Sequence, residues 1–333
     1  MERTEERAAA KRRLRPSQQV IVSVVFMLLF AGLVAFLPGF RQMDNLLALV
    51  QNVAVLGILG LGMALVVIGR GVDLSMVAAL SVPVALLMQM VQDGHGVGTA
   101  LAAALGLALA FGALNGWLIA YAEVPPLFVT LASGLFLAGI GPTFFFQLET
   151  VQWPPALDRL AVVGRGAVAG IPAPVWMLLV TLLVVGAFLR RLTLGAYVYA
   201  IGDNPQAARS SGIPTRPVIV LKYVACSVIA AFAGLVLAAS LGGLSTRVFN
   251  STLIYDVILV VVMGGIGLSG GRGGVGNVLV GTLLIGTLLN ALTILDVGYS
   301  LQNLIKGVVL LAAIVADTLL NPRNEETAQQ GDI

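Results

Sequence analysis

Residues 200–213 read Ala200-Ile201-Gly202-Asp203-Asn204-Pro205-Gln206-Ala207-Ala208-Arg209-Ser210-Ser211-Gly212-Ile213, a polar island in an otherwise apolar chain. Asp203 or Asn204 can cap a helix, and Pro205 suits the first turn of that helix. Gly212 can end it in a left-handed conformation. A short helix outside the membrane costs backbone ordering and gains little burial unless something docks on it. We therefore interpret this segment as a helix that binds a second protein.

The composition indicates an all-α polytopic membrane protein. Of the 333 residues, 58% are hydrophobic and only 11% are charged, and the mean hydropathy is +0.98, which lies beyond the apolar share of ordinary globular domains. The 39 glycines fit helices that pack closely in lipid. The single cysteine, Cys226, excludes an internal disulfide and is expected to be an apolar filler. With one cysteine and one histidine, no metal site is expected.

Ten apolar runs predict membrane-spanning helices. They cover residues 18–37, 47–68, 74–91, 98–119, 126–147, 173–190, 217–240, 252–267, 275–295 and 300–319. The run at 252–267 is short and enters a glycine-rich bend, so it predicts a tilted or broken helix. We divide the chain into a tail at 1–17, a transmembrane domain at 18–320 that includes a polar loop at 191–216, and a second tail at 321–333.

The positions of lysine and arginine predict the orientation of the chain. With the N-terminus inside, fourteen of these residues fall in inner segments and four in outer ones. The inner residues are Arg3, Arg7, Lys11, Arg12, Arg13, Arg15, Arg70, Arg190, Arg191, Arg209, Arg216, Lys222, Arg272 and Arg323. The outer ones are Arg41, Arg159, Arg165 and Arg247. This positive-inside bias predicts that both tails and the loop at 191–216 are cytoplasmic.

Familiar enzyme motifs fail on this chain. A P-loop needs Lys followed by Ser or Thr, whereas Lys11, Lys222 and Lys306 precede Arg, Tyr and Gly. The glycines at 271–276 match the dinucleotide pattern, but a membrane span follows them and no βαβ unit surrounds them. The chain is therefore expected to have no catalytic residues and to bind no cofactor. Any energy from ATP must come through another subunit.

Ionisable and polar residues inside the spans are candidates for function. Asp256 and Lys306 lie at similar depth from the outer side, which suggests an ion pair; the alternative is that Asp256 caps its helix and Lys306 snorkels outward. Uncharged polar residues can either line a path for a neutral, hydroxyl-rich solute or hold helices together. The set comprises Gln51 and Thr130 together with the path candidates Asn52, Asn115, Ser133, Asn290 and Asn303.

Three motifs carry a resemblance to a known family. They are Gly71-Val72-Asp73-Leu74-Ser75, the segment Ala200–Asn204 with Ser211-Gly212-Ile213, and a glycine-rich stretch from Asp256 through Gly273. In this order they resemble the sugar-importer permeases of the ribose, xylose, galactofuranose and autoinducer-2 type, the membrane subunits of bacterial ABC importers. The resemblance covers nearly all of residues 40–320.

The resemblance implies a type II ABC-importer-like permease with about ten helices in the bacterial cytoplasmic (inner) membrane, moving a sugar-like solute by alternating access. It implies three protein partners: a second permease, identical or similar, a cytoplasmic ATP-binding subunit, and a periplasmic substrate-binding protein. ATP and Mg would bind to the ATP-binding subunit. Membrane lipid would surround the permease, and no nucleic acid is expected to bind. The helix at 205–212 would be the coupling helix. Its residues for contact with the ATPase are Gly202, Asp203, Asn204, Pro205, Arg209 and Gly212.

Some positions depart from the pattern of these permeases. Val257, Leu259 and Val260 stand where alanine is common after the aspartate, and Asp203 stands where glycine is common. The larger side chains would fill space near the path, and Asp203 adds a charge to the coupling loop. The identity of the solute is therefore open.

Three other readings remain. A related permease for branched-chain amino acids shares the glycine-rich, many-span pattern, but it would need a site for a zwitterion, and deep charges are scarce. A stand-alone ion-coupled carrier would need buried acids in its central spans, whereas those found lie near the span ends. An intramembrane enzyme would need a nucleophile and a base, and the only histidine, His95, is predicted in an outer loop.

Overall fold

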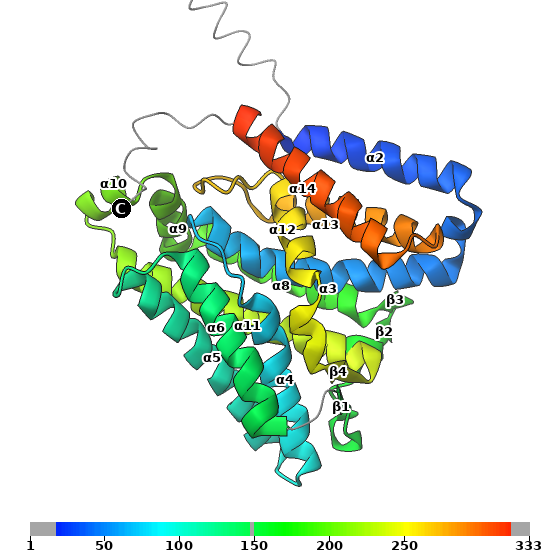
Figure 1. Ribbon diagram of the computed structural model, residues 1–333, viewed down its shortest axis with the longest axis horizontal. Coiled ribbons are helices and arrows are strands. Elements are labelled where there is room, and N and C mark those ends of the chain that lie inside the picture. The colour runs from blue at the N-terminus through cyan, green and yellow to red at the C-terminus, as the bar shows by residue number, and fades with distance from the viewer. Residues whose placement is uncertain (1–17, 147–149, 321–333) are drawn as a thin grey trace, which may run out of the picture.

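The structure is a computed structural model that describes residues 18–146 and 150–320 (Figure 1). The predicted tails at 1–17 and 321–333, with the cations they carry, lie outside the described residues. A helix occupies the position of every predicted span. These helices are α2 (Gln18–Phe36), α3 (Met43–Ile68), α4 (Met76–Gln92), α5 (Val97–Ala120), α6 (Pro126–Ile140), α8 (Ala173–Arg191), α11 (Thr215–Leu241), α12 (Leu253–Met263), α13 (Val275–Ile294) and α14 (Tyr299–Leu320).

Eight helices in the described ranges are long and apolar enough to cross a membrane. One of them is α6, which continues through a π-helical segment, η2 (Gly141–Phe146). The other two, α4 and α12, are apolar but shorter, with 17 and 11 residues. The prediction of an all-α polytopic membrane protein is confirmed.

Short elements connect the long helices. They are the 3₁₀ turns η1 (Pro38–Arg41), η3 (Pro155–Leu157) and η4 (Thr246–Asn250), the helices α7 (Val162–Arg165), α9 (Thr193–Asp203) and α10 (Pro205–Ser210), and the strands β1 (Thr150–Gln152), β2 (Ala167–Val168), β3 (Ile171–Pro172) and β4 (Gly243–Ser245). Strand β1 pairs antiparallel with β4, and β2 with β3. The β1–β4 pair ties the segment after α6 to the segment after α11.

Helix α3 is the central helix of the fold. Every residue from Val53 to Ile68 is buried, because α8, α11, α12 and α13 all pack against this helix. Helix α2, in contrast, is largely exposed and packs mainly on α13. A helix that is apolar on all sides can lie either in the centre of a membrane protein or at its periphery. The sequence alone therefore does not distinguish the central α3 from the peripheral α2.

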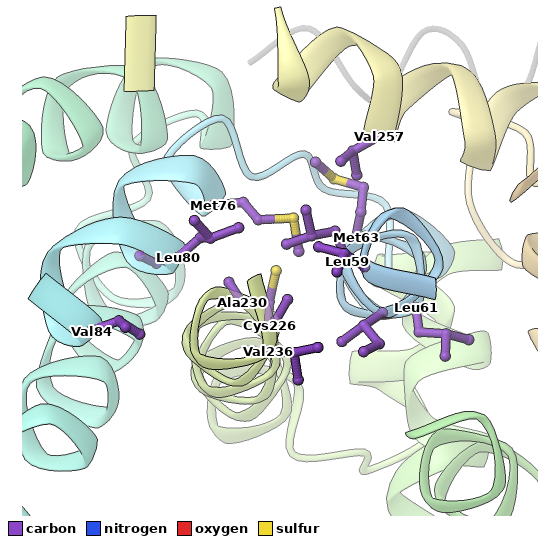
Figure 2. Close-up of a cluster of buried hydrophobic side chains, with 14 of the residues drawn as sticks. Leu59, Leu61, Met63, Met76, Leu80, Val84, Cys226, Ala230, Val236 and Val257 are labelled. Atoms are coloured by element: carbon purple, nitrogen blue, oxygen red, sulfur yellow. The ribbon is translucent and has the colours of Figure 1, made fainter. Parts of the chain in front are cut away.

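Apolar side chains from four helices meet beside α3. Figure 2 shows the side chains of this cluster, among them Leu59, Leu61 and Met63 of α3, Met76 and Leu80 of α4, residues of α11, and Val257 of α12. Cys226 of α11 lies fully buried in this cluster. The side chains drawn around it are apolar, and its thiol also interacts with the side chain of Asp73.

Glycines bring α5 and α11 into backbone contact. A Cβ atom on Gly112 would lie 2.6 Å from Cα of Val224, and one on Gly116 would lie 2.5 Å from Cα of Val220. Real Cβ atoms do not come so close to backbone atoms, so only glycine fits at these two crossings. The spacing of four residues is the small-residue pattern that lets membrane helices approach each other.

Helix α12 ends where the glycine-rich bend begins. Its last turn is followed by Gly264 and Gly265, and Gly265 has a φ of +89°, in the left-handed region that favours glycine. At its start, η4 and Thr252 precede the helix. The predicted span at 252–267 is therefore a continuous helix of 11 residues that ends before the glycine-rich bend.

The close approach of α5 and α11 gives a direct test. Gly116→Ala places a methyl group against the backbone of Val220, so the two helices must separate. We expect this variant to lower the midpoint of thermal unfolding in detergent, by the equivalent of about 1–3 kcal/mol. Gly106→Ala is the matched control, because it lies in the same helix and a Cβ there meets nothing within 4 Å. Equal midpoints for the two variants would contradict the packing described.

Candidate functional site

The polar island forms helix α10, with the end signals that its sequence provides. Asn204 has extended backbone angles, and its side-chain oxygen accepts hydrogen bonds from the N–H groups of Gln206 and Ala207, each at 3.0 Å. Pro205 occupies the first turn. Gly212 has a φ of +80°, and the next N–H, that of Ile213, donates to the carbonyl of Ala208 at 3.1 Å. Local chemistry therefore fixes both ends of this short helix.

Helix α10 is exposed on nearly all sides. Within Pro205–Ser210 only Ala208 is buried. The helix lies with α9 at one edge of the molecule (Figure 1). Its exposed residues include Gln206, Ala207 and Arg209. An ordered helix with so little burial of its own presents a surface to a partner.

The segment before α10 abuts the end of α3. A Cβ atom on Gly202 would lie 1.8 Å from the carbonyl oxygen of Ile68 and 2.5 Å from the nitrogen of Gly271. The N–H of Gly271 in turn donates to the Ile68 carbonyl at 2.8 Å. Gly271 has a φ of +73°, so the glycine-rich loop adopts a conformation that other residues rarely take. Figure 1 shows this loop, between α12 and α13, extending toward α9.

A buried lysine also binds to the backbone at the end of α3. Lys222 of α11 is 4% exposed, and its Nζ donates to the carbonyl of Gly69, directly after α3. A positive charge at this position also suits the negative end of the α3 dipole. We call the five residues Ile68, Gly69, Gly202, Lys222 and Gly271 the α3 junction. It joins α9, the glycine-rich loop and α11 to the last turn of one central helix.

The glycine-rich loop, which is hydrogen-bonded to α3, is also hydrogen-bonded to α9. The hydroxyl of Tyr199 donates to the carbonyl of Gly273 at 2.7 Å. Tyr199 is half-buried, and burial is the main cause that raises the pKa of its hydroxyl, which a nearby Arg190 opposes. The hydroxyl therefore stays protonated and able to donate at neutral pH.

The turn between α3 and α4 carries a buried polar network. Asp73 accepts hydrogen bonds from the N–H of Ser75, at 3.0 Å, and from the Ser75 hydroxyl. The side chain of Asn115 in α5 donates to that hydroxyl at 2.9 Å. The side-chain oxygen of Asn115 is buried and has no hydrogen-bond partner within the described residues. Of the path candidates, Asn115 is thus the one inside a buried polar network.

The other path candidates have different surroundings. Asn290 exchanges two hydrogen bonds with Asn45, at 2.8 and 3.2 Å. Ser133 bonds to the backbone of its own helix, Asn52 is exposed, and Asn303 is half-buried. Within the described ranges no hydrogen bond joins two of the five candidates. The structure therefore does not gather them into one polar lining.

Asp256 and Lys306 lie in contact. The Nζ atom of Lys306 is 2.8 Å from Oδ1 and 3.0 Å from Oδ2 of Asp256, and it also reaches the Thr252 hydroxyl at 3.4 Å. The two residues are 7% and 9% exposed. This ion pair connects α12 to α14, whose main partner is α12.

Comparison with known proteins places the chain in a family. The family model described as "Branched-chain amino acid transport system / permease component" matches residues 45–314. The chain belongs to this family of transport permeases. It is thus a transport component, multi-pass in the inner membrane, and the resemblance carried by the three motifs is confirmed.

Curated members of this permease family match over most of their length. The ribose import permease protein RbsC of Haemophilus influenzae is 30% identical over 92% of this chain and 94% of its own. The L-arabinose ABC transporter permease protein AraH of Azospirillum brasilense is 31% identical over 89% and 86%. The galactofuranose transporter permease protein YtfT of Escherichia coli is 31% identical over 79% and 78%. No solved structure matches the chain.

Sequence reasoning missed part of the site in this permease. It counted Lys222 among the cations of inner segments, whereas the structure buries that side chain within α11. It also had no signal for Asn45, the partner of Asn290. Lys222 falls within the predicted span at 217–240, so its position in a span was the available clue. The partner, a backbone carbonyl 153 residues away, leaves no trace in the sequence.

The buried ion pair can be tested by a double-mutant cycle. Lys306→Ala leaves the Asp256 carboxylate buried without its cation, and breaking a buried pair in this way costs about 3–5 kcal/mol. We expect a clear loss of thermal stability in detergent for Lys306→Ala and partial recovery in the double variant with Asp256→Ala. Additive effects of the two substitutions would show that the charges do not interact.

Proposed function

We propose that this chain is the membrane permease subunit of an ATP-driven importer that moves a sugar or sugar-like solute into the cytoplasm by alternating access. The observation that carries the proposal is its similarity to permeases named for ribose, L-arabinose and galactofuranose, over most of each chain. The solute would pass unchanged, because the chain supplies a path and no chemistry.

The distribution of charge favours a neutral solute over a zwitterionic amino acid. The family description names branched-chain amino acids, and a permease for these would need to accommodate a zwitterion. Within the described residues the buried charged side chains are Asp73, Lys222, Asp256 and Lys306. Asp256 and Lys306 pair with each other, and the other two have hydrogen-bond partners of their own. None is left over for a free ammonium or carboxylate group of a solute.

Helix α10 is the proposed docking point for the ATP-binding subunit. The chain has no P-loop lysine pattern, so hydrolysis needs a separate protein. The positive-inside bias places α10 on the cytoplasmic side, and exposed residues such as Arg209 give that protein a surface. A second permease, identical or similar, and a periplasmic substrate-binding protein complete the proposed assembly.

The α3 junction supports a route for the coupling motion. Only residues 211–214 separate α10 from α11, and Gly202 lies against the end of α3. When ATP closes the ATPase dimer, a displacement of α10 would act on α3 through Gly202 of the adjoining α9, and on α11 through the short linker. Because α3 is the central buried helix, its movement would alter the packing on which a path depends. Asn115, beside the α3–α4 turn, is the path candidate most directly affected.

Reconstitution tests the importer and its solute class together. We would purify the tagged permease from its native membrane in mild detergent, identify the co-purifying chains by mass, and reconstitute the complex in vesicles. We expect an ATPase subunit and ATP-dependent uptake of a labelled pentose or hexose when the binding protein is added. ATP-dependent uptake of leucine in place of sugar would favour the amino-acid permease. Uptake by the permease alone, without ATP, would point to a stand-alone carrier.

The coupling role of α10 is tested by its C-terminal glycine. Gly212→Val puts a β-branched residue at a φ of +80°, which should unwind the end of α10 and reduce ATP-dependent uptake at least tenfold while the protein still inserts. Gly94→Val is the matched control, with a φ of +89° and likewise nothing within 4 Å of the added Cβ, in the turn after α4. Replacing Pro205–Arg209 by a Gly-Ser stretch should have the same effect as Gly212→Val. Normal transport by these α10 variants would exclude α10 as the coupling helix.

A further inference from the structure

A groove runs between the C-terminal turns of α5 and the N-terminal turns of α11. It has an apolar arm along the two helices and a cationic arm toward α10. The two arms share Tyr121 and Pro217 as lining residues, so they lie next to each other. We call it the α5–α11 groove. On the orientation proposed above, it opens at the level of the cytoplasmic membrane surface.

The apolar arm is shaped by small side chains. Ala110 and Ala113 form part of its lining, between the larger Leu114 and Trp117 of α5 and Val220 of α11. Leu114 is 44% exposed and Trp117 is 53% exposed. Trp117 also stacks on Tyr121, with ring centroids 6.5 Å apart. A tryptophan and a tyrosine near a helix end are typical of the membrane interface.

The cationic arm holds two arginines. Arg209 belongs to α10 and Arg216 to the first turn of α11. The guanidinium of Arg216 lies 5.4 Å from the centre of the Tyr121 ring and 3.0 Å from a carboxylate oxygen of Glu123. This ion pair is exposed, so it is weak and open to exchange. Arg209 makes no ion pair within the described residues.

We propose that the α5–α11 groove binds an anionic phospholipid of the cytoplasmic leaflet, with its phosphate between Arg209 and Arg216 and one acyl chain in the apolar arm. The match of charge and polarity supports this occupant, because the groove combines an apolar trough with a cationic end at the aromatic interface. Guanidinium groups bind phosphate oxygens in a bidentate manner, and basic pockets beside membrane helices select anionic head groups. The choice of leaflet rests on the proposed orientation; the binding itself does not.

The position of Arg209 would connect lipid binding to helix α10. This residue belongs to α10, whereas the other lining residues belong to α5 and the residue after it, to the linker before α11, or to α11. A phosphate held by both arginines would tie the docking helix to the start of α11 through the lipid. The content of anionic lipid would then influence how firmly α10 is held when a partner docks on it.

Native mass spectrometry of the purified permease tests the site. The probes are phosphatidylglycerol and phosphatidylethanolamine with identical acyl chains, added in detergent. We expect the wild-type protein to retain phosphatidylglycerol preferentially, and each of Arg209→Gln and Arg216→Gln to lower its affinity about fivefold, as expected for one arginine near a lipid surface. Arg191→Gln is the charge-matched control, since Arg191 is exposed at the end of α8 and does not line the groove. Unchanged preference in the double arginine variant would overturn the proposal.

Two further variants separate the parts of the site. Glu123→Gln removes the competing carboxylate and should raise retention of phosphatidylglycerol. Ala113→Phe fills the apolar arm and should lower retention, with the unfolding midpoint measured to show that the protein is intact. Full displacement of the lipid by millimolar inorganic phosphate would identify a site for free phosphate and overturn the lipid assignment. Because the assay needs no transport, its failure is distinguishable from failure of the importer proposal.

Discussion

The carbonyl end of α3 is the constraint on which one whole face of this permease depends. The last turn of any helix leaves backbone carbonyls without partners, and inside a membrane protein water does not reach them readily. Residues directly after α3 satisfy three of these carbonyls through the N–H groups of Gly69, Arg70 and Gly71. The carbonyls of Ile68 and Gly69 receive donors from Gly271 and Lys222, far away in the chain. The need to satisfy two oxygens thus brings the glycine-rich loop and α11 to one place, and Gly202 of α9 packs against the same carbonyl of Ile68.

The two buried lysines show two ways of holding a charge in such a protein. Lys306 has a carboxylate partner, Asp256, and the pair ties α14 to α12. Lys222 has a backbone carbonyl at the negative end of a helix and an aromatic ring, that of Tyr223, 5.5 Å from its Nζ. Loss of the first lysine leaves an unpaired buried ion, whereas loss of the second leaves an unpaired carbonyl. The penalty differs accordingly, because an unpaired ion is much costlier to bury than an unpaired dipole.

Hydropathy and capping chemistry predicted those features that depend on neighbouring residues. The positions of the helices follow from apolar runs, and the ends of α10 follow from Asn204 and Gly212, which act on their own backbone. Contacts between distant segments could not be predicted. The fit of Gly202 against Ile68 depends on how α9 lies on α3, and the β1–β4 pairing joins residues more than 90 positions apart. A single sequence does not specify which distant segments pair or in which register, because many segments of the chain have a similar composition.

The glycines illustrate this limit, because the same residue type serves two different purposes in this chain. In α5, Gly112 and Gly116 are helical and serve backbone contact with α11. In the loop after α12, Gly270, Gly271 and Gly273 have φ between +73° and +106° and shape a chain that hydrogen-bonds to α3 and α9. The sequence predicts a glycine-rich bend here, and the structure shows that this loop is closely packed. Because the loop is hydrogen-bonded to both α3 and α9, the displacement of α10 proposed above would reach α3 by two routes, through Gly202 of α9 and through this loop.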